Sequence, residues 1–192
     1  YDVEVPVDGD YTLHLRYATD EARPVQVFFD SRNISKCCKG VTFSAAPSAR
    51  SNTITAKSSG AKWESVVNRF GGLVKLSAKK GTHTIKLTRR GPLPHLVTLR
   101  LDTDKAFPED YKPPQYKVRD IESVPAEFRK TLKPSAGVDL AMLRAPVKAQ
   151  PGDKPGNLIQ IPAWTYDRGN VRIYASPDKY ADAGPVVGSA EG

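Results

Sequence analysis

Few residues in this chain have the types and spacing that chemistry requires. The chain holds three histidines, and His14 and His83 each stand in a run of alternating apolar and polar residues, which is typical of a β-strand. No Gly-x-Ser-x-Gly motif occurs, and nothing in the sequence brings Glu64 and Asp102 together as a carboxylate pair. Because catalysis needs matched groups within hydrogen-bonding distance, we expect that the protein is not an enzyme.

The two cysteines, Cys37 and Cys38, are neighbours in the sequence. A bridge between them would be a strained vicinal disulfide, and one metal ion rarely uses two adjacent residues. Two cysteines make neither a disulfide framework nor a zinc site. Two interpretations therefore stay open, namely two free thiols or one vicinal bridge that locks a loop.

The charge of the chain raises the question of a polyanionic partner. Lys and Arg number 29 against 21 Asp and Glu, a net charge of +8 with a pI near 9.5. The pairs Lys79-Lys80 and Arg89-Arg90 stand at expected turns, and no known nucleic-acid motif or aromatic platform accompanies them. We expect no specific nucleic-acid binding, and an acidic polysaccharide suits the charge better. No apolar run approaches the roughly 20 residues of a membrane span.

Residues 1–102 read as a series of short strands. The clearest is the alternation of Tyr11, Leu13, Leu15 and Tyr17 with polar residues. Short strands that each have one apolar face predict an antiparallel β-sandwich. Residues 31–62 read as polar loops with one strand near 40–43. The remaining predicted strands take their apolar residues from Val3–Val7, Val25–Phe29 (after a break at Pro24), Leu73–Leu76, His83–Leu87 and Val97–Leu101.

Residues 103–157 differ from their neighbours because they contain 8 of the 16 prolines. We expect an irregular bridge without a core of its own, with one short helix over 125–132 capped by Ser123 and a further turn near 139–143. Residues 149–157 have the composition of a linker. Over 158–192, strands return at Leu158–Ile161 and around Val171 and Ile173, separated by a turn at 166–170.

Four stretches resemble the β-sandwich carbohydrate-binding modules of family 6 and its relatives, such as family 35. They are the run from YDVEVPVDGDYTLHLRYA to PVQVFF, then AKWESV, LVKLSAKKGTHTIKL and GPLPHLVTLRL, in the order of the family over about 100 residues. The resemblance implies a jelly-roll sandwich of the galactose-binding-domain-like type. It also implies a non-catalytic domain that recognises glycans.

The order of the strands departs from that family. Its modules begin with two strands that are missing before Tyr1, whereas IQIPAWTYDRGNVRI and VVGSAEG near the C-terminus resemble that start. Two explanations are open. In the favoured one the domain is circularly permuted, so that 158–192 completes the sandwich of 1–102 and 103–157 bridges them. In the other, 158–192 begins a second repeat. Completion would cover strand edges that otherwise promote aggregation.

The resemblance also assigns candidate sugar-binding residues. Trp63 falls where the family places a tryptophan that stacks on a sugar ring, and Tyr180 falls in the loop of the opposing aromatic ring. His95 takes the place of an asparagine that bonds sugar hydroxyls, with Lys62 or Glu64 as further hydroxyl partners. A second tryptophan of the family is replaced by Val66, so the site is expected to be altered.

A structural calcium ion of the family is expected to be absent or weakened. Pro162 and Trp164 stand where the family has two glutamates, and a hard cation needs several oxygen ligands. Asp102 is a weak residual candidate. We therefore expect no cofactor.

These observations predict an all-β sandwich that binds a polysaccharide or acidic glycan through loop aromatics. The chain starts at Tyr1 without an initiator methionine, so we interpret it as a fragment or processed piece of a longer protein. The resemblance implies that this larger protein is exported, outside the cell or in the periplasm, with its other domains as partners. The alternative is a structural or protein-binding sandwich with a degenerate sugar site.

Overall fold

The computed structural model describes residues 1–18, 23–34, 41–43, 62–65, 75–114, 126, 134–138, 143, 157–167, 169, 171–174 and 185–189. Within these residues the chain is almost entirely β-structure, and the regular elements follow one another as short strands. They are β1 (Asp2–Val5), β2 (Gly9–Ala18), β3 (Arg23–Phe29), β4 (Arg32–Asn33), β5 (Val41–Phe43), β6 (Lys62–Ser65), β7 (Lys75–Ala78), β8 (Gly81–Thr88), β9 (His95–Asp102), β10 (Leu158–Pro162), the 3-10 helix η3 (Ala163–Thr165), β11 (Val171–Tyr174) and β12 (Val186–Ser189).

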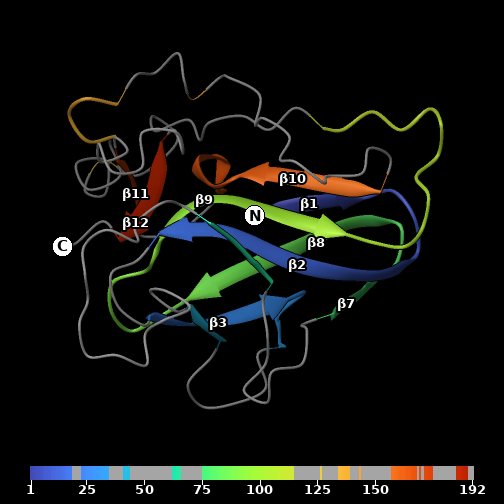
Figure 1. Ribbon diagram of the computed structural model, residues 1–192, viewed down its shortest axis with the longest axis horizontal. Coiled ribbons are helices and arrows are strands. Elements are labelled where there is room, and N and C mark those ends of the chain that lie inside the picture. Colours follow the sequence, from blue (N-terminus) through green and yellow to red (C-terminus); the bar gives the residue numbers. More distant parts are fainter. Residues whose placement is uncertain are drawn as a thin grey trace.

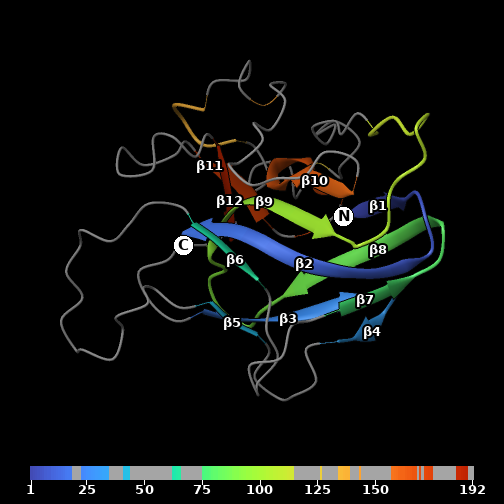
Figure 2. The same ribbon diagram turned by 45° about the vertical axis from the view of Figure 1, so that its right-hand side comes forward.

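The described strands form two antiparallel sheets that pack face to face as a sandwich. One sheet has the order β1-β8-β3-β4, with β5 also paired to β3. The other has the order β11-β12-β9-β2-β6, with β10 also paired to β9 and β7 to β2. Figure 1 shows β2 and β9 side by side in front of β8 and β3. In Figure 2, β6 and β7 follow each other along the same edge of β2. The predicted all-β sandwich is confirmed.

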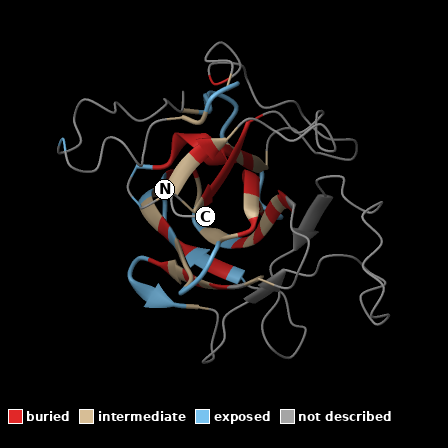
Figure 3. Cartoon of the chain, turned by 90° about the vertical axis from the view of Figure 1, so that its left-hand side faces the viewer, coloured by how far each residue is buried: buried red, intermediate tan, exposed pale blue. Residues whose placement is uncertain are grey.

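The core lies between the sheets and takes one face of β1, β2, β3 and β7. The alternating residues Tyr11, Leu13, Leu15 and Tyr17 of β2 are at most 1% exposed, as their spacing predicts. Figure 3 shows the buried residues of the strands gathered around this interior. The opposite sheet contributes a matching set that is also almost fully buried, namely Val3, Val5, Val25, Val27, Phe29 and Ile85.

Strand β9 is the centre of the larger sheet. Leu99 and Leu101 face the core opposite Leu15 and Leu13 of β2. A bulge interrupts this pairing, because Arg16 pairs with Thr98 while the next residue, Tyr17, pairs with Leu96. Such a bulge changes the direction in which the following side chains point. Polar and apolar residues therefore exchange the face of the sheet on which they lie within one strand.

The C-terminal strands complete the sheet that the N-terminal segment begins. Ile159 and Ile161 of β10 pair with Leu101 and Leu99 of β9, and Val187 of β12 pairs with Leu96. The hydroxyl of Tyr1 donates to the carbonyl of Ala163 at 2.9 Å. The described strands of the N-terminal and C-terminal segments thus share one sandwich. That their order is permuted relative to a family stays a prediction.

Several sequence-based boundaries differ from the structure. The predicted strand Leu73–Leu76 is found as β7 at Lys75–Ala78, and Pro24 lies within β3 and does not precede it. Val7 follows β1 in a bend. Of the predicted helix over 125–132 only Ala126 is described, as helical, and of the turn near 139–143 only Leu143. The remainder of both lies outside the described residues.

Candidate functional site

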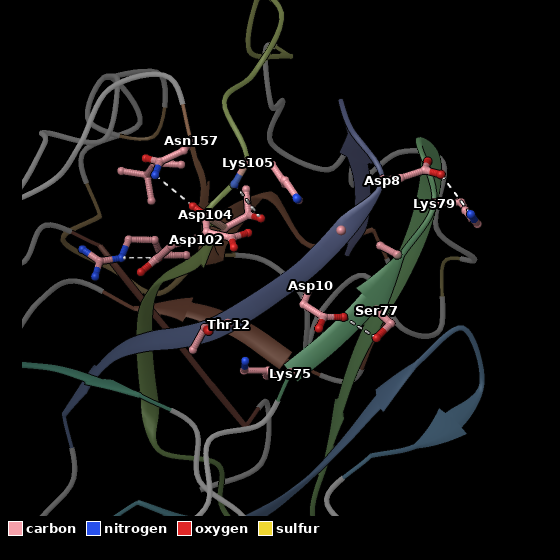
Figure 4. A pocket seen from close by; sticks show the side chains of 15 residues that line it. Asp8, Asp10, Thr12, Lys75, Ser77, Lys79, Asp102, Asp104, Lys105 and Asn157 are labelled. Carbon is pink, nitrogen blue, oxygen red and sulfur yellow. Dashed lines mark hydrogen bonds and ion pairs between the residues drawn. The ribbon is translucent and has the colours of Figure 1, made fainter.

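A polar groove lies on the outside of the larger sheet, across β2, β7 and β9 (Figure 4). Its side chains come from four segments, within 8–12, 75–79, 100–105 and 157–158, and it encloses about 970 Å³. These segments are far apart in the sequence. We call this feature the polar groove.

Strand alternation explains why the floor of the groove is polar. Because Tyr11, Leu13, Leu99 and Leu101 point into the core, their neighbours in β2 and β9 must point outward. Pairing then sets these outward residues side by side. In one row Thr12 lies between Lys75 and Asp102, and in the next row His14 pairs with Arg100.

One end of the floor is a cluster around Asp102. Its Oδ1 accepts a hydrogen bond from Arg100 Nε at 3.1 Å, and its Oδ2 lies 2.8 Å from His14 Nε2. The side chains of His14 and Arg100 are 14% and 18% exposed, whereas that of Asp102 is 36% exposed. The sheet therefore holds this carboxylate between two nitrogen groups, with one flank open to a ligand.

A second carboxylate, that of Asp8, ties the rim of the groove to the turn between β7 and β8. It accepts hydrogen bonds from the Lys80 amide at 2.7 Å and from Lys79 Nζ at 2.9 Å. These bonds hold the pKa of Asp8 below its ordinary value, the amide bond contributing most. Ser77 Oγ also donates to Asp10, so β7 is fixed against β2 by side chains as well as by backbone.

The opposite rim is built where the chain leaves β9 and where it enters β10. Thr103 and Asn157 exchange two hydrogen bonds, from the Thr103 amide to the Asn157 carbonyl at 3.2 Å and from Asn157 Nδ2 to the Thr103 carbonyl at 2.8 Å. Gly9 leaves space for this rim, because a Cβ there would stand 3.2 Å from Lys105 Cγ. The bridge between the two strand groups is thus fixed at both of its ends.

The groove is close to charge balance. Four carboxylates face four cationic side chains along it, and the residues are Asp8, Asp10, Asp102 and Asp104 against Lys75, Lys79, Arg100 and Lys105. Hydroxyl and amide groups of Thr12, Ser77 and Asn157 stand among them. Such a set offers donors and acceptors at close intervals, which suits a ligand rich in hydroxyl groups.

A metal centre has no support in the part of the chain that the structure describes. There, no group of three or more His, Cys, Asp or Glu side chains converges. Asp102, the residual calcium candidate, is instead engaged by Arg100 and His14. Pro162 ends β10, and Trp164 is buried in the core, where its indole N–H donates to the Leu143 carbonyl at 2.9 Å.

The described members of the predicted sugar-binding set lie elsewhere on the same sheet. His95 begins β9, at the end opposite Asp102, and its half-buried ring lies 6.1 Å from the ring of Tyr174. Strand β6 contains Lys62, Trp63 and Glu64. It pairs with the same edge of β2 as β7 does, but further along the strand and beyond the groove.

Pairing brings part of this set together. Trp63 pairs with Arg16, and Lys62 pairs with Tyr17, which pairs on its other side with Leu96, the neighbour of His95. Lys62 and His95 are therefore two strands apart at one end of the sheet. Tyr180, Val66 and the cysteines Cys37 and Cys38 lie outside the described residues.

A second polar cluster joins the turn after β3 to the turn before β8. His83 Nδ1 lies 2.6 Å from Asp30 Oδ2, and its Nε2 lies 2.7 Å from the Lys79 carbonyl oxygen. The imidazole ring stacks on Phe29 with the centroids 5.0 Å apart. Burial disfavours the charged imidazole, but the bonds to Asp30 and Lys79 outweigh it and raise the pKa of His83.

Sequence reasoning missed most of the groove. It assigned no role in a site to Asp8, Asp10, Lys75, Ser77 or Asn157. A signal existed in the polar positions of β2, whose outward face must present Thr12, His14 and Arg16 together. The partner strands on either side of that face are not evident from the sequence.

These features define the class of the protein, an all-β sandwich with a polar groove on one sheet. A scan against protein-family models, a search of curated proteins and a search of solved structures each found no match. Among the described residues, no helix is both long and apolar enough to cross a membrane.

Proposed function

We propose that this chain is a non-catalytic carbohydrate-binding module with a jelly-roll, galactose-binding-domain-like sandwich. The observation that carries the proposal is the polar groove, in which hydroxyl, amide, carboxylate and ammonium groups line an open surface of a rigid sheet. Sites on strands hold their side chains in fixed positions, which limits the entropy lost when a flexible glycan binds.

The balanced charge of the groove favours a neutral stretch of polysaccharide over a strongly acidic one. In this proposal Lys75 and Asp104 bond sugar hydroxyls along the floor and rim. The glycan continues along β2 toward β6, where Trp63 stacks on a sugar ring. Tyr180 opposes Trp63, and His95 with Lys62 or Glu64 bonds further hydroxyls.

The test is affinity electrophoresis in gels that contain soluble neutral polysaccharides, one polysaccharide per gel. We expect at least one of them to retard the wild-type chain. Trp63→Ala should weaken that retardation about tenfold, because a stacked aromatic ring contributes roughly 1–1.5 kcal/mol. Lys75→Ala should weaken it by a smaller factor.

Lys86→Ala is the matched control for Lys75→Ala, because it removes the same charge from an exposed strand position on the other sheet. It should leave the retardation unchanged. The proposal fails if no polysaccharide retards the wild type, or if Trp63→Ala and Lys75→Ala both migrate as the wild type does.

The alternative function is a structural or protein-binding domain of a larger exported protein. Under this alternative Trp63 is a packing residue. Its fluorescence would then resist quenching by acrylamide, and Trp63→Ala would lower the free energy of unfolding without any glycan response to lose.

A further inference from the structure

A second groove lies between the edges of the two sheets and differs from the polar groove in its lining. It encloses about 920 Å³. One wall comes from β8 and the segment after it, and the other comes from β12 with Tyr166, Asp167, Gly169 and Val171. Apolar side chains dominate, among them Leu87, Leu93, Leu96, Val171 and Val187. We call it the interlayer groove.

Arg89 lines this groove with a hydrogen-bond donor that has no partner. Its Nη1 atom is buried, and within the described part of the chain no acceptor reaches it. Leaving a buried charged donor unsatisfied costs free energy, and such groups are rare in folded proteins. A ligand acceptor that reaches the guanidinium with a small movement of this side chain would recover that cost.

The segment that carries Arg89 is fixed in place. The Leu93 amide donates to Ser189 Oγ at 2.9 Å, and the Leu93 carbonyl accepts from Arg23 Nη1 at 2.8 Å. The Arg89 guanidinium lies against Gly91, where a Cβ would stand 3.6 Å from Nε. These contacts anchor the backbone that follows Arg89 and place its guanidinium beside the turn at Gly91.

The acidic residues of the interlayer groove are already engaged by groups of the protein. Asp2 accepts from Thr84 Oγ1, Asp30 binds His83 and the Thr84 amide, and Asp167 accepts from the Asp2 amide at 2.6 Å. On the basic side, Arg90 is exposed and Lys86 lies 5.4 Å from the Phe28 ring centroid. The described lining holds three carboxylates and three cationic side chains, the latter being Lys86, Arg89 and Arg90. Among these cations, Arg89 is the one with a buried nitrogen that lacks an acceptor.

We propose that the interlayer groove is a binding site for a small carboxylate with an apolar body. The carboxylate accepts hydrogen bonds from the Arg89 guanidinium, and hydrogen bonds between arginine and a carboxylate are particularly strong. The apolar body lies against Leu87, Leu93 and Val171, and its surface is thereby removed from water. This site is separate from the polar groove and does not depend on the proposed glycan binding.

Isothermal titration with octanoate tests the site, with octanamide as the neutral counterpart of the same shape. Wild-type protein should bind octanoate saturably and octanamide about tenfold more weakly or not at all. Arg89→Gln should weaken octanoate binding about tenfold or more, because it removes the buried charge. Arg32→Gln removes an equal charge from an exposed position in β4 that does not line the groove, and it should change the affinity less than about threefold.

Thermal unfolding separates a ligand-binding role of Arg89 from a structural one. Without ligand, Arg89→Gln should unfold at the same temperature as the wild type or higher, because an uncompensated charge has been removed. Its retardation by polysaccharide should stay unchanged. Absence of saturable octanoate binding, equal losses in Arg89→Gln and Arg32→Gln, or a lower unfolding temperature in Arg89→Gln would each overturn the proposal.

Discussion

His83 has a hydrogen-bond acceptor at each ring nitrogen, the Asp30 carboxylate and the Lys79 carbonyl. A neutral imidazole has one N–H and can satisfy only one of them, whereas the imidazolium satisfies both. The backbone supports this arrangement, because Asp30 and Ser31 adopt positive φ angles of 47° and 67° that carry the carboxylate to the ring. The raised pKa of His83 follows from this geometry.

The cluster predicts a pH-dependent stability. The folded-state pKa of His83 lies above its unfolded value, so the stabilisation is complete below the ordinary histidine pKa and is lost as pH rises through the folded value. His83→Gln should therefore destabilise the protein more at about pH 5.5 than at about pH 8.5, by about 1 kcal/mol. Urea unfolding at both pH values measures the difference.

Asp30→Asn provides the control for this prediction. Without the carboxylate, the pH dependence of the His83→Gln effect should shrink. The lowered pKa of Asp30 adds a separate term, which is present above the ordinary aspartate pKa and lost as pH falls through the folded value. An equal effect of His83→Gln at both pH values would contradict the assignment.

Gly188 permits the close packing of β12 on His95. A Cβ at this position would stand 3.0 Å from His95 Cδ2 and 3.3 Å from Tyr174 Cε2. We expect Gly188→Ala to lower the free energy of unfolding by roughly 1–3 kcal/mol through overpacking between these rings. Gly9→Ala is the comparison, because its new methyl would meet the flexible Lys105 side chain and should cost less. Chemical denaturation of both variants tests the ranking.

At the level of elements, β9 is the central strand of the larger sheet, because three strands pair with it, namely β2, β10 and β12. Leu99 lies at the crossing of two of these pairings, between Leu15 and Ile161. Leu99→Ala should lower the free energy of unfolding by about 2–5 kcal/mol, because the surrounding strands cannot collapse into the cavity. Leu93→Ala, at a half-buried position, should cost markedly less. Equal costs would show that β9 is not central.

The elements also show what the sequence could predict. The strict alternation of Tyr11 to Tyr17 identifies β2, because one of its faces is polar. Strand β9 is less regular, since Leu96, Val97 and Thr98 are all buried around a bulge. The local sequence pattern indicates which face of a strand is buried, but it does not indicate which other strands pair with it. The polar groove could not be predicted for that reason, as Thr12, Lys75 and Asp102 meet only through strand order.

At the level of the whole molecule, the described strands share one core, so we expect them to unfold as one cooperative unit. Trp164, after β10, is buried in the same core as the side chains of β2. In Trp63→Phe it becomes the only tryptophan, because the chain contains two. Its fluorescence in urea should then follow the same transition as the far-ultraviolet circular dichroism of the sheets. Two separate midpoints would show that 158–192 unfolds independently.

The late position of β10 in the chain has a consequence for synthesis. Strand β9 leaves the ribosome long before its partner β10, so in the interval its backbone donors and acceptors have no strand along that edge. Nascent sheet edges of this kind recruit other chains. The long sequence separation between the partners also slows folding, because the entropy cost of closing the loop arises before the favourable strand contacts form. The molecule should therefore depend on chaperones during expression more than its final stability suggests.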